Sequence, residues 1–310
     1  MWSEEFMTTG GLSDKRPSKN QRREAARDKA KLIRVEQQKK DRRNKFLLQG
    51  GIGLAAVGIV VVVALVIMNS IRPAVPGPAN MASDGILIGE GLTAVTTPAL
   101  QPEATPVASQ PDASGTVANI RVYVDYLCPY CGDFETTNGD QIAQWVDSGA
   151  ATVEIHPIAI LTGRSAGSQY SLRAANAAAC VANYSPDNFY AFNSAMFVDQ
   201  PAENTTGRSD ADLQDVVRNS GVTTALTQID TCITDETYKS WVIASTDRAT
   251  AGPIPNSPLT AIASTPTVLV DGKQYQGSLA DPKEFAAFVL QSAGESYSTS
   301  TPTPSAPPAG

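Results

Sequence analysis

Two cysteines separated by two residues, Cys128 and Cys131, are the residues whose types and spacing could do chemistry. Thiol–disulfide exchange requires a thiolate near neutral pH and a second thiol close enough to resolve a mixed disulfide. A Cys-x-x-Cys pair at a helix start meets both requirements, because the free N–H groups and the positive end of the helix dipole stabilise a thiolate. We therefore expect Cys128 to attack and Cys131, one turn further on, to resolve.

The residues around the pair predict a strand, a helix and a second strand. In residues 120–125 aliphatic side chains alternate with polar or aromatic ones, which is the period of a strand. Residues 134–146 carry hydrophobic side chains at helical spacing, and residues 151–160 predict the second strand. This order implies a right-handed crossover between parallel strands. Pro129 suits the first helical turn and stiffens the dipeptide between the cysteines.

A Cys-x-x-Cys pair can also be half of a zinc site or a permanent structural bridge. A zinc site would need a second close pair, yet Cys180 and Cys232 are fifty-two residues apart and lie in segments predicted to be helical. A structural bridge would not need a helix N-terminus directly after a strand. The redox interpretation is therefore favoured, and we expect no metal site.

The remaining residues between 118 and 294 complete an α/β domain. Residues 164–258 are rich in Ala and carry helical periodicity and helix caps, which predicts a helical insertion. Residues 267–275 predict a hairpin, because Asp271-Gly272 accepts the positive φ angles of a tight turn. A last helix is predicted to begin at Asp281, where Asp-Pro-Lys-Glu forms a capping pattern. The order is βαβ, helical insertion, ββα.

This order of elements and the run YLCPYCGDFE at residues 126–135 resemble the DsbA-like branch of the thioredoxin superfamily, in particular its membrane-anchored actinobacterial members. The resemblance covers about residues 118–292. It implies a thioredoxin fold and the oxidation of dithiols in newly exported proteins. It also implies that Pro266 follows a cis bond beside the cysteine pair, and that Thr265 offers backbone hydrogen bonds to a substrate chain. Glutaredoxins share Cys-Pro-Tyr-Cys, but they are small and cytoplasmic.

Other residues near the pair are candidates for tuning its reactivity. A nearby carboxylate moves the pKa of a thiol, so Asp125 or Glu135 could tune Cys128 or relay protons to Cys131. An exposed helix charge is the favoured alternative for Glu135, whereas both interpretations of Asp125 remain open. We expect His156 to be a solvent-facing strand residue, because thiol exchange does not require a His. The tuning candidates are Pro129, Tyr130, Asp125 and Glu135.

Cys180 and Cys232 are expected to form a second disulfide that staples the helical insertion. Closing a loop of about 50 residues stabilises a fold by about 4 kcal/mol in the chain-entropy model. The alternative is that this pair passes electrons to Cys128.

Residues 46–71 contain no charged side chain and are mostly aliphatic or Gly, which predicts one transmembrane helix. A cleaved signal peptide is the alternative, but forty-five largely polar residues precede this segment. Residues 1–45 hold fourteen Lys and Arg, so the positive-inside bias places them in the cytoplasm and residues 72–310 outside. Acidic residues are interspersed in the basic run, which favours a solvated topology signal over a nucleic-acid or lipid site. We expect a single-pass protein of the cell membrane.

The segments that flank the predicted domain are poor in hydrophobic residues. Residues 72–117 contain seven prolines among many Ala, Thr, Ser and Gly residues, which predicts an extended linker. A short apolar stretch at residues 86–88 could add an edge strand to the domain. Residues 295–310 have the composition of a disordered tail.

The charge distribution and the single His exclude several classes of function. Residues 47–310 hold ten Lys and Arg against twenty-four Asp and Glu, which argues against nucleic acid as a principal partner. One His excludes a multi-His metal site. The sequence thus predicts a membrane-anchored oxidoreductase that introduces disulfides into unfolded, exported polypeptides and is reoxidised by a membrane redox partner. Its cofactor is only the Cys128–Cys131 disulfide. A reductase or isomerase, or a tethered binding module, are the alternatives.

Overall fold

The structure is a computed structural model that describes residues 20, 23–24, 27–43 and 75–300. It divides into two units, Met1–Pro73 and Ala74–Gly310. In the first unit, residues 27–43 are helical and exposed along their whole length. The predicted transmembrane segment, residues 46–71, lies outside the described residues. Among the residues that are described, no helix is both long enough and apolar enough to cross a membrane.

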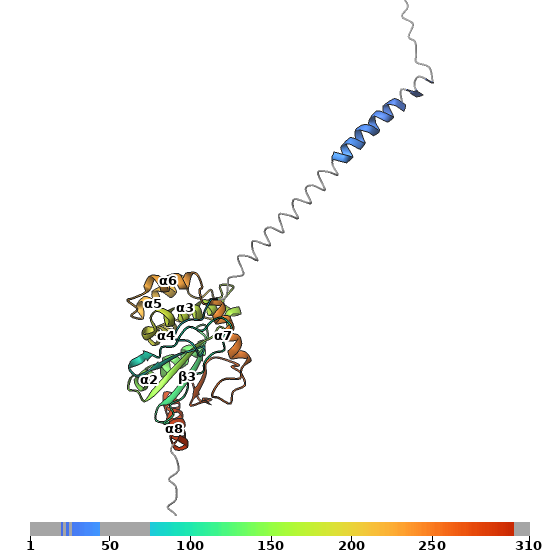
Figure 1. The fold of residues 1–310 in the computed structure, drawn as a ribbon. Coiled ribbons are helices and arrows are strands. Elements are labelled where there is room, and N and C mark those ends of the chain that lie inside the picture. Colours follow the sequence, from blue (N-terminus) through green and yellow to red (C-terminus); the bar gives the residue numbers. More distant parts are fainter. Residues whose placement is uncertain (1–19, 21–22, 25–26, 44–74, 301–310) are drawn as a thin grey trace, which may run out of the picture. The chain divides into compact units, whose positions relative to one another are not determined.

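A six-stranded sheet forms the centre of the second unit (Figure 1), with the strand order β2-β1-β4-β3-β5-β6. The central pair β3 and β4 is parallel, with Ile120 opposite Val153, and the helix α2 connects the two strands. The hairpin β5–β6 joins β3 in the antiparallel direction, and its turn is the predicted Asp271-Gly272, with positive φ at both residues. The elements are β1 (Ile86–Gly89), β2 (Thr93–Ala94), β3 (Ala118–Val124), α2 (Pro129–Asp147), β4 (Ala151–Pro157), β5 (Thr267–Val270) and β6 (Lys273–Gln274).

The expected linker at residues 72–117 is wrong for much of its described part. Residues 86–88 pair with β4 in the antiparallel direction, and Ile86 and Ile88 are fully buried. The Asn80 side chain donates a hydrogen bond of 2.9 Å to Ala182 O in the helical insertion. The domain therefore includes residues well before 118.

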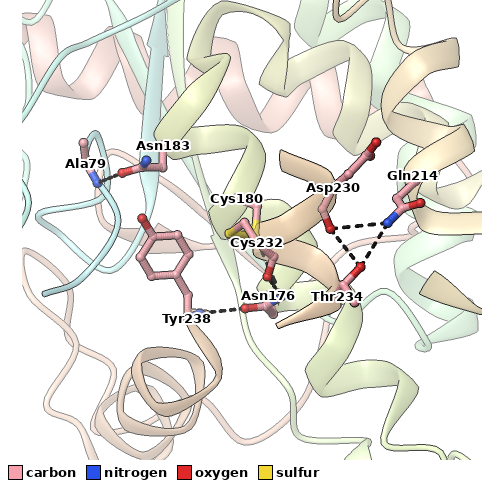
Figure 2. Close-up of a disulfide and its surroundings, with 9 residues drawn as sticks. All are labelled: Ala79, Asn176, Cys180, Asn183, Gln214, Asp230, Cys232, Thr234 and Tyr238. Carbon is pink, nitrogen blue, oxygen red and sulfur yellow. Dashed lines mark hydrogen bonds between the residues drawn. A yellow bond between two sulfur atoms is a disulfide. The ribbon is translucent and has the colours of Figure 1, made fainter. Parts of the chain in front are cut away.

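The helical insertion between β4 and β5 packs around one nearly completely buried helix, α3. Its alanines have no long side chains, so neighbouring helices approach closely. The disulfide between Cys180 of α3 and Cys232 of α6 ties two of these helices together (Figure 2). The helices are α3 (Tyr170–Tyr184), α4 (Phe189–Phe197), α5 (Asp210–Asn219), α6 (Leu226–Thr234) and α7 (Lys239–Ala251).

The last helix, α8 (Pro282–Ser300), is longer than predicted. Asp281 Oδ1 accepts hydrogen bonds from the backbone N–H groups of Lys283 and Glu284, as expected of an N-cap. The predicted disordered tail is wrong for residues 295–300, which continue the helix; Glu295 there pairs with Lys273 of β6. Residues 301–310 lie outside the described residues.

The prediction that His156 faces solvent is also wrong. Its ring stacks on Tyr123 with the ring centroids 4.5 Å apart, and its side chain is buried. Its Nε2 lies 3.2 Å from Glu154 Oε2, although not in the direction of a hydrogen bond. Helix α7 and the segment after it cover this face of the sheet, with Ala249 and Ile254 in the same apolar cluster as Tyr123. A surface that strand periodicity predicts to be open is thus a second, smaller core.

Candidate active site

Cys128 lies where strand β3 has ended and helix α2 begins. It is the N-cap of α2, with Pro129 at the first helical position. Its backbone N–H donates a bond of 2.9 Å to Asp125 O, which closes the turn between strand and helix. Cys131 lies one turn along the same helix, and both cysteines are free thiols. This is the strand-to-helix junction that the sequence predicts.

The surroundings of the two sulfur atoms drive their pKa values in opposite directions. The pKa of Cys128 is lowered to about 6, and the main cause is a hydrogen bond from the Cys131 thiol. Hydrogen bonds from the Thr265 side chain and from the N–H groups of Tyr130 and Cys131 lower it further, whereas burial opposes the shift. Burial raises the pKa of Cys131 well above its ordinary value, and the neighbouring Cys128 sulfur adds to this rise. Near neutral pH the pair therefore holds an anion at Cys128 and a neutral thiol at Cys131.

The segment Thr265-Pro266 lies against Cys128. The peptide bond between Thr265 and Pro266 is cis, as the resemblance implied. The Cys128 thiol donates a hydrogen bond of 3.1 Å to Thr265 O. With Cys128 as a thiol, the buried Thr265 hydroxyl has no hydrogen-bond partner within the described part of the chain. It is thus available to donate to a Cys128 thiolate, which is how it lowers that pKa. A second cis bond, Gly252–Pro253, was not expected.

Asp125 is completely buried beneath the active-site turn. Its carboxyl accepts hydrogen bonds of 2.9 Å from the N–H groups of Leu127 and Leu161, and one of 2.7 Å from the Ser171 hydroxyl. Burial raises the pKa of Asp125 to about 6, and these three hydrogen bonds oppose the rise. The carboxyl thus joins the turn before Cys128 to the loop after β4 and to α3.

The favoured interpretation of Glu135 as an exposed helix charge is wrong. Its carboxylate accepts a hydrogen bond of 2.6 Å from the Ser194 hydroxyl and one of 3.3 Å from the Asn193 amide. Burial raises the pKa of Glu135, because helix α4 packs across this face of α2. The residue connects the helix of the cysteine pair to the insertion.

The other two tuning candidates, Pro129 and Tyr130, are exposed beside Cys128. The Tyr130 side chain retains 63% of its accessible surface, so an aromatic ring faces solvent next to the reactive sulfur. A partner that approaches Cys128 therefore meets an apolar residue. Val198, the C-cap residue that follows helix α4, is a second exposed apolar residue and is also 63% accessible.

Sequence reasoning missed one polar residue of this site, Gln200. Its amide donates hydrogen bonds of 3.0 and 2.9 Å to the carbonyl groups of Tyr126 and Cys128. No pattern marks it, because it lies in a polar loop seventy-two residues after Cys128.

The expected pairing of Cys180 with Cys232 is confirmed. Both residues are buried, and Asn176 beside them accepts a hydrogen bond of 2.8 Å from Tyr238 N and donates one of 3.4 Å to Cys232 O (Figure 2). The disulfide ties α3 to α6, and Asn176 connects α3 to Tyr238, the N-cap of α7. Within the described ranges, no group of three His, Cys, Asp or Glu residues could hold a metal ion.

Comparisons with known proteins agree with this architecture. The family model described as thioredoxin (Thioredoxin_4) matches residues 103–290. The reduced form of the disulfide bond oxidoreductase DsbG from Mycobacterium tuberculosis is 27% identical, with a TM-score of 0.50 over 72% of this chain and 96% of that chain. Reduced DsbA from Mycobacterium tuberculosis is 29% identical, with a TM-score of 0.49 over 70% of this chain and 100% of that one.

A curated relative is much longer than the matched segment. The serine/threonine-protein kinase PknE of Mycobacterium tuberculosis (strain ATCC 25618 / H37Rv) is 33% identical over 106 residues, which are 33% of this chain and 19% of the kinase. The chain thus spans about a fifth of the curated relatives it matches. The structure of the disulfide bond oxidoreductase DsbG is similar to that of this chain, and the family model covers more than half of the sequence, so the chain belongs to the thioredoxin family.

Proposed function

We propose that this chain is a membrane-anchored, extracytoplasmic thiol–disulfide oxidoreductase that introduces disulfides into exported polypeptides. The observation that carries the proposal is the arrangement at Cys128. Its sulfur lies at the start of α2, where the Cys131 thiol and the N–H groups of Tyr130 and Cys131 stabilise its anion. The neutral thiol instead donates a hydrogen bond of 3.1 Å to the Thr265 carbonyl, which places the sulfur beside that backbone. A stabilised thiolate is a good leaving group, so a disulfide that contains it is readily transferred.

The proposed reaction begins with the Cys128–Cys131 disulfide. A substrate thiolate attacks the Cys128 sulfur, a mixed disulfide forms, and the Cys131 sulfur leaves and takes up a proton, as its raised pKa favours. A second substrate thiolate then attacks the substrate sulfur of the mixed disulfide and expels the Cys128 thiolate. The substrate has lost two electrons and the pair has gained them. A membrane redox partner, which accepts two electrons from the reduced pair, completes the cycle.

The backbone of Thr265 and the exposed ring of Tyr130 support a role in holding the substrate chain. Thr265 O lies beside the reactive sulfur, where an extended peptide could pair with the backbone of this segment. The Tyr130 ring offers apolar surface at the same place. An unfolded polypeptide with exposed apolar side chains fits this arrangement.

The anchor and the topology rest on the sequence alone. The uncharged segment 46–71 and the basic residues before it support an N-terminus in the cytoplasm and a catalytic domain outside. A membrane-impermeant maleimide tests this: it should label Cys128 of the reduced protein in intact cells. Labelling only after lysis would place the site inside the cell.

A transfer assay tests the activity. The full-length chain in detergent, with its Cys128–Cys131 pair oxidised, should pass one disulfide to a reduced, unfolded polypeptide, and the Cys128→Ser variant should pass none. Equilibration with glutathione then separates the alternatives. A potential nearer the about −120 mV of DsbA supports an oxidant, whereas one near the about −270 mV of thioredoxin supports a reductase. The absence of any exchange would support a tethered binding module.

A further inference from the structure

One side-chain amide from the helical insertion bonds to two carbonyl groups of the active-site turn. Gln200 Nε2 donates a hydrogen bond of 3.0 Å to Tyr126 O and one of 2.9 Å to Cys128 O. The Cys128 carbonyl is also the first acceptor of helix α2, with bonds of 3.0 Å from Cys131 N and 3.3 Å from Gly132 N. The carboxamide therefore holds the turn on both sides of Leu127, at the point where strand becomes helix.

The loop that carries Gln200 is itself held in place. The Arg208 guanidinium donates a hydrogen bond of 2.7 Å to Met196 O, one of 3.3 Å to Asp199 O and another to Val198 O. These carbonyls belong to the end of α4 and to the residues directly before Gln200. The Gln200 side chain thus extends from a turn of the insertion whose position is fixed. Its hydrogen bonds therefore restrict the motion of the active-site backbone.

The residue after the cysteine pair fits this arrangement. A Cβ atom added to Gly132 would lie 2.4 Å from Gln200 Oε1, closer than atoms approach. Gly132 has ordinary helical surroundings and no need for a special backbone angle. The carboxamide packed against its Cα gives a physical reason for glycine at this position. The Gln200 carboxamide therefore occupies the space that a side chain at position 132 would need.

We propose that Gln200 is a positioning residue for Cys128, through which the helical insertion sets the reactivity of the cysteine pair. The proposal rests on the proposed function for its biological meaning but not for its test. The N–H groups of Tyr130 and Cys131 stabilise the Cys128 sulfur only while the Cys128 backbone keeps its place at the helix start. Gln200 fixes that place by holding the Cys128 and Tyr126 carbonyls.

The test removes the hydrogen bonds of Gln200 to the active-site turn in two ways and includes a control variant in the helical insertion. Gln200→Met keeps the length of the side chain and removes its donors, whereas Gly132→Ala displaces the carboxamide by filling its space. Gln214→Met is the control: the Gln214 amide donates bonds of 3.3 and 3.2 Å to Asp230 O and Thr234 Oγ1, between α5 and α6 (Figure 2). The Gln214→Met variant loses two similar hydrogen bonds, neither of which involves the active-site turn.

The readout is the pH dependence of Cys128 alkylation in the reduced full-length chain. Gln200→Met and Gly132→Ala should both shift the midpoint upward by about half a pH unit, which lowers the thiolate population at pH 5 about threefold. Gln214→Met should leave the midpoint unchanged even where it lowers the unfolding temperature. An unchanged midpoint in Gln200→Met, with a loss of stability like that of the control, would show a purely structural role and overturn the proposal.

This readout separates the proposal from the proposed function. Alkylation reports the Cys128 thiol whether or not the chain oxidises any substrate. A wild type without exchange activity would refute the function and leave the alkylation test in force. Conversely, full oxidase activity with identical midpoints in wild type and Gln200→Met would refute the positioning role alone.

Discussion

The Cys128 thiol donates a hydrogen bond of 3.1 Å to the carbonyl oxygen of Thr265, 137 residues further along the chain. This contact joins the start of α2 to the segment that precedes β5, across the whole length of the helical insertion. The fold can make it because β3 and β5 are neighbours in the sheet, with Val122 opposite Val268. The reactive sulfur therefore lies beside a backbone segment on which a substrate chain could bind.

The Cys131→Ser variant should accumulate mixed disulfides with substrate polypeptides through Cys128. Without the second thiol the mixed disulfide has no intramolecular route to resolution. Non-reducing electrophoresis of cells that express the variant should show adducts that disappear on reduction. The matched Cys128→Ser variant should trap almost nothing, because the raised pKa of Cys131 keeps it a neutral thiol. Equal trapping by both variants would contradict the assigned roles.

The burial of Asp125 should make the stability of the domain fall as the pH rises. Its folded-state pKa of about 6 lies above the value of 3.8 in an unfolded chain, so the folded state holds the proton more tightly between these values. The contribution of Asp125 to stability is then full below about pH 4 and is lost as the pH rises through about 6, by up to about 3 kcal/mol. Urea unfolding of wild type and Asp125→Asn across this range measures the effect.

The Asp125→Asn variant carries a constant cost, because an amide has fewer acceptor atoms for the three hydrogen bonds. It should lack the pH-dependent loss that Asp125 causes, so the difference between the two proteins should shrink as the pH rises. Glu135, whose pKa is also raised, is present in both and cancels from the comparison. Parallel stability curves would show that Asp125 keeps an ordinary pKa.

Removal of the Cys180–Cys232 disulfide should destabilise the domain without changing the chemistry at Cys128. The bridge closes a loop with a sequence separation of 52 residues, for which the chain-entropy model gives about 4 kcal/mol. Denaturant unfolding of the Cys180→Ala/Cys232→Ala variant measures this loss. Its alkylation midpoint and its transfer of a disulfide to a model substrate should match the wild type. Loss of transfer in folded protein would support the electron-relay alternative.

Residues before 118 should contribute to the core. Ile88 on β1 is fully buried, so Ile88→Ala should cost about 2–5 kcal/mol in the free energy of unfolding. Val107→Ala is the control, because that side chain is 63% exposed and its backbone bond to Ala82 O is retained. A negligible effect of Ile88→Ala would restore the interpretation of this segment as a linker.

The sequence predicts the parts of the fold that short-range patterns encode. The alternation in residues 120–125, the helical spacing after Cys131 and the Asp271-Gly272 turn each act over a few residues, and the structure contains all three elements. The cis bond before Pro266 came from the resemblance, since no local pattern distinguishes this proline from the others.

The errors share a physical cause, which is a partner far away in the sequence. The strand expected at residues 86–88 is confirmed, although β2 lies beyond it at the edge of the sheet. The linker predicted around it is wrong because this segment contacts distant parts of the chain, β4 about 65 residues later and Ala182. His156 is buried because α7 covers its face of the sheet, and Glu135 because α4 packs on α2. Gln200 bonds to Cys128 from a loop seventy-two residues further along the chain. The periodicity of hydrophobic residues predicts a single helix or strand. It does not predict which other element packs against that helix or strand, and these contacts depend on that packing.

The pH dependence of Cys128 alkylation in the reduced, full-length wild type tests the central claim most directly. The hydrogen bonds from Cys131, from Thr265 and from the first turn of α2 predict a midpoint near pH 6, with rapid alkylation at neutral pH. A midpoint near the value of about 8.5 for a free cysteine would contradict a thiolate held at the start of this helix.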